Sequence, residues 1–191
     1  MMRIEKIIKE SLDNHLEVLD FLQAHQDSIK DIAALFISSL RNSGKIIFMG
    51  NGGSASDANH LAAELVGRFK KNRKPFASIS LSSNISLITA IGNDLGFEEI
   101  FSRQLEALAK PEDVIVAIST SGESLNVINA VKKAKNLGLK SVGFLGRDGG
   151  KLKNIVDLSL VIPTKDTPRI QEMHILVGHI ICEIIEEELL A

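Results

Sequence analysis

The stretch Ile46-Ile47-Phe48-Met49-Gly50-Asn51-Gly52-Gly53-Ser54-Ala55-Ser56-Asp57-Ala58-Asn59-His60-Leu61-Ala62-Ala63-Glu64 decides the fold. Its first four apolar residues indicate a buried strand, the glycine and serine turn ends that strand, and a helical pattern begins directly after the turn. Such a strand–turn–helix unit is the usual opening of a parallel α/β domain. His60 and Glu64 are four residues apart and therefore lie on one face of the predicted helix.

Short apolar runs alternate with helical patterns along the rest of the chain. Runs rich in Ile, Val and Phe without polar alternation predict strands buried on both faces, and strands separated by helices pair in parallel. We therefore expect a flavodoxin-like, three-layer α/β/α sandwich around a five-stranded parallel sheet. The expected strands are 45–49, 76–81, 114–118, 141–145 and 158–162, and the expected helices are 55–69, 85–91, 98–109, 125–137 and 168–190.

Two amphipathic helices are expected within residues 1–43, before the first strand. A leading helix that has no sheet to cover often packs on a partner subunit, so this segment is expected to provide oligomer contacts as well as core cover. Residues 44–191 would form the α/β core. A length of 191 residues suits a single domain that spans the whole chain.

Charge and composition narrow the classes of function. A net charge of −2 argues against bulk binding of nucleic acid or of anionic membranes, and the short basic run 68–74 is interpreted as a solvated helix end and loop. The apolar run 175–185 is too short to span a bilayer, and the amino terminus does not resemble a signal peptide. The single cysteine, Cys182, is expected to be a small core residue in a reducing compartment, which predicts a cytoplasmic protein.

Ligands of open parallel sheets bind at the carboxyl ends of the strands, and two of these ends are rich in candidate groups. After the first strand, the turn 50–54 lets the backbone approach a ligand beside a helix amino terminus. After the third, Ser119-Thr120-Ser121-Gly122-Glu123-Ser124 places four hydroxyls where a phosphate can bind without a lysine. One hydroxyl is enough for an N-cap, so four favour an anion site. The turn Asn93-Asp94 either contacts a sugar or only closes a helix.

His60 and Glu64 present a nitrogen and an oxygen on one helical face, which suits a divalent metal ion, but two ligands are too few for zinc. The last helix is the obvious source of more ligands and carries Gln171, Glu172, His174 and His179. Gln171 and His179 project within about a quarter-turn of each other. A lone histidine on an apolar helix is more often a core residue, so the choice among these side chains stays open on spacing alone.

Together, these motifs resemble the sugar isomerase (SIS) domain family, and within it the members that isomerise heptose phosphates. The resemblance spans nearly the whole chain and rests on 50–55, 60–64, 119–124, and 169–172 followed by His179. The serine loop is typical of the broad family. The His-x-x-x-Glu pair and the Gln-Glu pair with a later histidine are far more specific.

The resemblance implies an isomerase that converts sedoheptulose 7-phosphate to D-glycero-D-manno-heptose 7-phosphate for surface polysaccharide. It also implies a homotetramer with active sites between subunits and one Zn²⁺ per subunit. The positions that match the family's metal ligands are His60, Glu64, Gln171 and His179. Those that match its substrate contacts are Asn51, Gly52, Gly53, Glu64, Asn93, Asp94, Ser119, Thr120, Ser121, Ser124 and Gln171. Glu64 is then the expected base, His179 its acid–base partner, and His174 a structural residue.

Two other hypotheses remain open. A non-catalytic SIS tetramer that binds a replication initiator protein would need the assembly but no intact set of metal and acid–base residues. A domain that senses sugar phosphates would bind without turnover and would usually accompany a DNA-binding region, for which the sequence has no pattern. Because His60, Glu64, Gln171 and His179 are all present, the enzyme is the favoured hypothesis.

Overall fold

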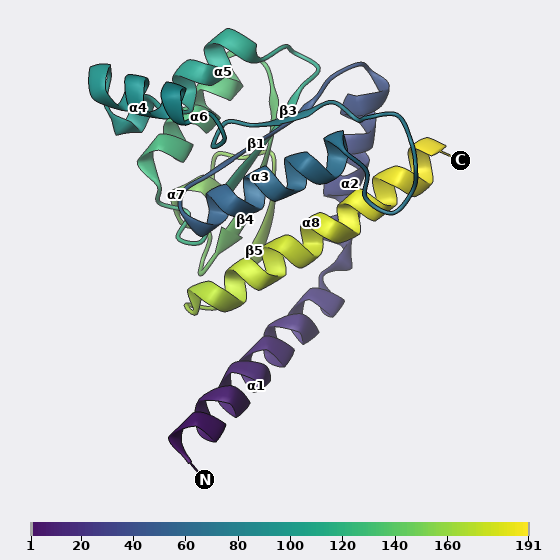
Figure 1. Cartoon of the computed structure of the whole chain (residues 1–191), viewed down its shortest axis with the longest axis vertical. Coiled ribbons are helices and arrows are strands. Elements are labelled where there is room, and N and C mark those ends of the chain that lie inside the picture. The colour runs from purple at the N-terminus through teal and green to yellow at the C-terminus, as the bar shows by residue number, and fades with distance from the viewer. Residues whose placement is uncertain (1, 191) are drawn as a thin grey trace.

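The computed structural model describes residues 2–190, and in them the expected α/β architecture is confirmed (Figure 1). Five parallel strands form one sheet in the order β2-β1-β3-β4-β5. Their bounds are β1 Ile46–Gly50, β2 Ser78–Ser80, β3 Val114–Ser119, β4 Lys140–Gly146 and β5 Leu158–Ile162. The strand order reverses between β1 and β3, so the carboxyl ends of these two neighbours form the crevice in which ligands of such sheets bind.

Helices cover both faces of the sheet, as expected for three layers. One face carries α2 (Gln26–Arg41), α3 (Gly53–Val66) and α8 (Thr167–Leu190), and the other carries α5 (Ser102–Leu108), α6 (Leu125–Asn136) and α7 (Gly150–Lys153). Neighbouring residues of β1 belong to the cores on opposite faces of the sheet. Phe48 lies in the core formed with α2 and α3, and Met49 lies in the core formed with α5 and α6. This two-sided burial explains why the strand reads as a continuous apolar run. Within residues 2–190, no helix is both long and apolar enough to cross a membrane.

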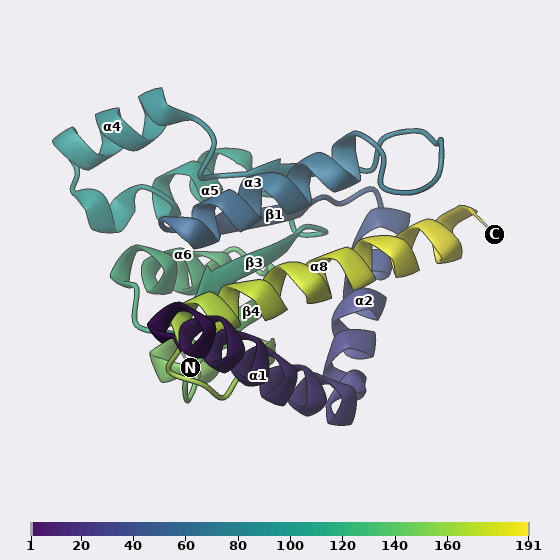
Figure 2. The same ribbon diagram turned by 60° about the horizontal axis from the view of Figure 1, so that its bottom comes forward.

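The first helix, α1 (Arg3–Ala24), stands apart from the sandwich. It buries only Val18 and Leu22, near its carboxyl end. Its middle crosses the start of α8, where Nδ1 of His15 lies 2.7 Å from Oε2 of Glu172 (Figure 2). The first half of α1 therefore leaves its apolar side chains without cover from the sheet.

Some element boundaries differ from the prediction because the segments contact other parts of the chain. The helix expected at 55–69 ends at Val66, where the backbone turns at Gly67. The strand expected at 76–81 has only three residues, since the N–H of Phe76 donates to the carbonyl of Leu65 rather than to a strand. The helix expected at 98–109 is divided into the 3₁₀ turn η1 (Phe97–Glu99) and α5, with buried Ile100 and Phe101 between them.

The basic run 68–74 is only partly solvated. Lys70 and Lys71 form exposed ion pairs with acidic residues of α8, as expected of a solvated face. Arg73 contradicts the expectation, because its side chain is fully buried in an ion pair with Glu186. The run folds back onto α8 after Gly67 instead of extending into solvent.

Candidate active site

The turn after β1 brings backbone groups to the crevice between β1 and β3. Gly52 has a φ of 57°, a left-handed conformation that glycine adopts without strain. A Cβ atom on Gly53 would lie 2.1 Å from Nε2 of Gln171. The side chain of Gln171, from α8, therefore lies against the first residue of α3, and only glycine leaves room for it. Two of the predicted site residues are thus in contact.

The serine loop after β3 gathers its hydroxyls. The Ser119 hydroxyl lies 3.1 Å from that of Ser124 and 3.5 Å from that of Ser121, and the N–H of Gly122 donates to Ser119 Oγ. The Ser124 side chain makes no hydrogen bond to the amino terminus of α6, which it precedes. Ser124 thus occupies the N-cap position without capping the helix through its side chain, and its hydroxyl lies against that of Ser119 instead. The arrangement suits an oxyanion beside a helix amino terminus.

A reciprocal pair of amides joins the two loops. Nδ2 of Asn51 donates to Oδ1 of Asn126 at 2.9 Å, and Nδ2 of Asn126 donates to Oδ1 of Asn51 at 2.8 Å. Asn126 lies in the first turn of α6 and is buried. Sequence reasoning identified Asn51 but missed Asn126, since no local pattern indicates a partner 75 residues away. The pair fixes the turn after β1 relative to the serine loop.

Three predicted site residues from α3 and α8 converge, because these helices lie side by side on one face of the sheet (Figures 1 and 2). Nε2 of His60 lies 3.1 Å from Oε1 of Glu64 and 3.0 Å from Nε2 of His179. One ligand atom from each residue lies within 4.8 Å of the other two. Imidazole nitrogens this close either share one proton or bind one cation, so the donor set fits a divalent metal ion.

The surroundings of His179 favour its neutral form. Burial lowers its pKa, and the positive charge that His60 can carry lowers it further, while Glu64 acts in the opposite direction. A neutral imidazole is the form that binds a metal ion. The ring of Phe69 stacks on that of His179, with ring centroids 5.5 Å apart.

Asp57, one turn before His60 on α3, is a further carboxylate that sequence reasoning did not single out. Burial raises its pKa to about 6, although a charged His60 lowers it. Its Oδ2 atom is buried and has no hydrogen-bond partner among residues 2–190. The i, i+3 spacing from His60 is the only sequence signal that points to it.

Asn93 and Asp94 are not joined to the loops by any described side-chain contact. They lie exposed at the end of α4 (Ile85–Asp94), where Nδ2 of Asn93 donates to Oδ1 of Asp94 at 2.7 Å. None of the α4 residues is buried, although the helix is largely apolar, and it extends away from the sheet in Figure 2.

By contrast, His174 is buried in α8, and its Nε2 atom lies 3.0 Å from the carbonyl oxygen of Leu145 in β4. This burial agrees with the structural role expected for it.

Fold and site together define a class: a doubly wound α/β domain with a loop of clustered hydroxyls and a nearby cluster of two histidines and a glutamate. The family model described as "SIS domain" matches residues 12–146. The chain is 53% identical over 184 residues to "Phosphoheptose isomerase" of Helicobacter pylori strain P12, with 96% of each chain covered. It is 47% identical over 185 residues to "Phosphoheptose isomerase" of Aquifex aeolicus, with 97% of this chain and 95% of the relative covered.

Solved structures agree with the curated relatives. The phosphoheptose isomerase of Neisseria gonorrhoeae has a TM-score of 0.92 at 38% identity, with 96% of this chain and 99% of that chain covered. The enzyme from Francisella tularensis has a TM-score of 0.93 at 33% identity, with 98% and 100% covered. The chain belongs to the SIS domain family and, within it, to the phosphoheptose isomerases. The predicted family is thus confirmed.

Proposed function

We propose that this chain is an aldose–ketose isomerase that converts sedoheptulose 7-phosphate to D-glycero-D-manno-heptose 7-phosphate, for the heptose of surface polysaccharide. The observation that carries the proposal is the convergence of His60, Glu64 and His179. Close similarity to named phosphoheptose isomerases over nearly the whole chain supports it. A cytoplasmic setting is part of the proposal, since the single cysteine is buried and unpaired.

The reaction needs a base that moves a proton between neighbouring carbons. We assign Glu64 as the group that removes the proton from C1 of the ketose and returns it at C2. As the C1 proton leaves, a double bond forms between C1 and C2, and the carbonyl oxygen on C2 takes a proton from His179. The C1 hydroxyl of the enediol then returns a proton to the same ring nitrogen of His179, while the protonated carboxyl of Glu64 delivers its proton to C2, which gives the aldose and restores both residues. Oε1 of Glu64 faces His60, so we assign the carbon proton to its other oxygen.

One Zn²⁺ per subunit is part of the proposal, held by His60, Glu64, Gln171 and His179. The close approach of the two histidines and the glutamate supports three of these ligands. Gln171 lies against Gly53, at the start of the helix that carries His60. When bound, the ion would supply a fixed positive charge that raises the acidity of the substrate's carbon.

The loops at the strand ends would bind the two ends of the substrate. We assign the phosphate to the hydroxyls of Ser119, Thr120, Ser121 and Ser124, and the sugar to Asn51, Gly52 and Gly53. The gathered hydroxyls of the serine loop support the first assignment. Asn93 and Asp94 would contact the sugar. Their position at the end of the uncovered helix α4 is consistent with a site completed by another subunit.

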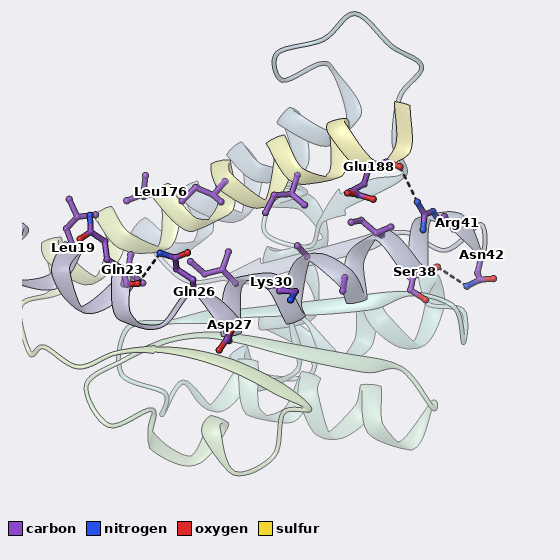
Figure 3. Close-up of a pocket in the computed structure, with 17 residues that line it drawn as sticks. Leu19, Gln23, Gln26, Asp27, Lys30, Ser38, Arg41, Asn42, Leu176 and Glu188 are labelled. Atoms are coloured by element: carbon purple, nitrogen blue, oxygen red, sulfur yellow. Dashed lines mark hydrogen bonds between the residues drawn. The ribbon is translucent and has the colours of Figure 1, made fainter. Parts of the chain in front are cut away.

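A homotetramer with active sites between subunits is also proposed. Five apolar side chains of α1 before the buried Val18 are each more than half exposed, namely Ile4, Ile7, Ile8, Leu12 and Leu16. Beside them, an apolar groove of about 920 Å³ runs between α2 and α8, lined by residues that include Leu19, Ile29 and Leu176 (Figure 3). Apolar surface of this extent on a soluble protein usually marks an interface.

The proposal is tested by incubating the Zn²⁺-loaded protein with sedoheptulose 7-phosphate and identifying the product by NMR. An aldose 7-phosphate is expected, and the rate should disappear after chelation and return when Zn²⁺ is added back. If no aldose forms in protein of verified metal content, the enzyme assignment is wrong and a binding role without turnover is favoured.

A further inference from the structure

A buried ion pair joins the loop after α3 to the last turns of α8. Nε of Arg73 lies 2.8 Å from Oε1 of Glu186, and the two side chains are 0% and 1% exposed. The same carboxylate accepts three successive backbone N–H groups, from Phe69, Lys70 and Lys71, at 2.9–3.0 Å. Burial raises the pKa of Glu186, but these donors together outweigh it and lower the pKa below its usual value. The carboxylate of Glu186 is thus held in its ionised form by four donors, three backbone N–H groups and the Arg73 guanidinium.

Arg73 also binds the backbone of Glu64. Its Nη2 atom donates to the carbonyl of Glu64 at 2.9 Å, and its Nη1 atom donates to the carbonyl of Leu65 at 2.9 Å. Because α3 ends at Val66, these carbonyls lack the donors that a longer helix would provide. The guanidinium replaces the missing donor at Glu64 and shares the Leu65 carbonyl with the N–H of Phe76. It holds the last turn of α3 at the residue assigned as the base.

The same loop contacts His179. Phe69 donates its N–H to Glu186, and its ring stacks on the imidazole of His179 at an interplanar angle of 25°. Glu186 follows His179 by seven residues, two turns along α8. The loop closed by Arg73 and Glu186 therefore contacts the cluster at two places. Arg73 binds the backbone carbonyl of Glu64, and the ring of Phe69 stacks on His179.

We propose that Arg73 and Glu186 are positioning residues, which set the placement of Glu64 on α3 relative to His179 on α8 and thereby the metal affinity and turnover of the site. The turnover part rests on the proposed function, whereas the metal part rests on the geometry of the cluster alone. A lysine cannot replace Arg73, because only the planar guanidinium fork reaches the carboxylate and two carbonyls at once.

The test compares the full-length variants Arg73→Met, Arg73→Lys and Glu186→Gln with the wild type. Metal-stripped protein is titrated with Co²⁺, whose visible absorption reports both affinity and ligand geometry. Substitutions beside metal ligands typically weaken binding or activity 10- to 100-fold, so we expect roughly 10-fold weaker Co²⁺ binding and an altered spectrum. With sedoheptulose 7-phosphate, we expect kcat to fall by a similar factor and KM to stay nearly constant.

The matched control is Lys71→Met, which removes an exposed ion pair from the same loop but leaves the backbone N–H to Glu186. It should retain wild-type Co²⁺ binding and kcat. If Arg73→Met fails to fold, the Co²⁺ affinity and kcat of Arg73→Lys and Glu186→Gln decide whether the ion pair positions the cluster.

A purely structural ion pair would lower the unfolding temperature of these variants while the folded protein keeps wild-type Co²⁺ affinity, spectrum and kcat, and that result would overturn the inference. Absence of Co²⁺ binding by the wild type would also overturn it. If the wild type binds Co²⁺ but does not isomerise the sugar, the proposed function fails while the Co²⁺ titrations still decide the positioning role.

Discussion

The two halves of the candidate site are held by different means. The loops after β1 and β3 follow strands paired in one sheet, and the Asn51–Asn126 amide pair locks them together. The cluster comes from two helices, with His60 and His179 119 residues apart and His60 about half exposed. The main chain thus preorganises the half that we propose binds the substrate (the binding half), whereas the half that we propose carries the chemistry (the chemical half) depends on how two helices pack. We expect substitutions in the first half to change mainly substrate affinity, and substitutions in the second to change mainly turnover.

The strongest test of this division is Glu64→Gln. An amide cannot take a proton from carbon, and loss of a general base typically costs roughly 10²- to 10⁴-fold in rate. We expect kcat to fall by that order while sedoheptulose 7-phosphate still binds through the serine loop, as measured by calorimetry. Glu183→Gln, an exposed glutamate of α8 that pairs with Lys70, is the control. Near-normal turnover of Glu64→Gln would rule out its role as base, and loss of both binding and turnover would show that the two halves are not separate.

The same division explains what the sequence could predict. The strand–turn–helix unit at 46–64 is local, so its apolar run and Gly52 were sufficient to identify the fold and one side of the site. The positions of Arg73 and Asn126 could not be predicted in this way. Their partners lie 113 and 75 residues away. Hydrophobic periodicity is a local property of the sequence, so it does not indicate which distant side chain forms a hydrogen bond with a buried donor. The predicted bounds of β2 and α3 were wrong for the same reason. The N–H of Phe76 and the guanidinium of Arg73 donate to backbone carbonyls at the end of α3, a contact that the local pattern does not show.

A smaller effect is expected at His174, which ties the helix of the chemical half to the sheet. Burial lowers its pKa from 6.5 to about 4, opposed by the bond to the Leu145 carbonyl. Between these pKa values the unfolded chain binds a proton at His174 that the folded chain does not. The free energy of unfolding therefore has its full value, as far as His174 is concerned, above pH 6.5 and decreases as the pH falls toward 4. Between pH 7.5 and 5, the loss is about 2 kcal/mol.

The measurement is urea unfolding of the wild type and of His174→Gln at both pH values. Glutamine keeps a donor for Leu145 but does not titrate, so the variant should lose less stability on acidification. Other titrating groups contribute equally to both proteins and cancel in the difference. Equal losses would mean that His174 is not held neutral by the fold.

The smallest effect is expected from a substitution in the amide pair between Asn51 and Asn126, which belongs to the binding half. Asn126→Asp keeps the shape of the side chain but cannot donate to Oδ1 of Asn51, so one bond between the loops is lost and two oxygens face each other. We expect the free energy of unfolding to fall by about 1–2 kcal/mol. KM for the sugar phosphate should rise several-fold while kcat stays constant, because the cluster lies on α3 and α8. Asn136→Asp, exposed at the end of the same helix, controls for the added charge. A fall in kcat at unchanged KM would mean that the amide pair supports the cluster, and that the division between binding and chemistry does not follow the division between loops and helices.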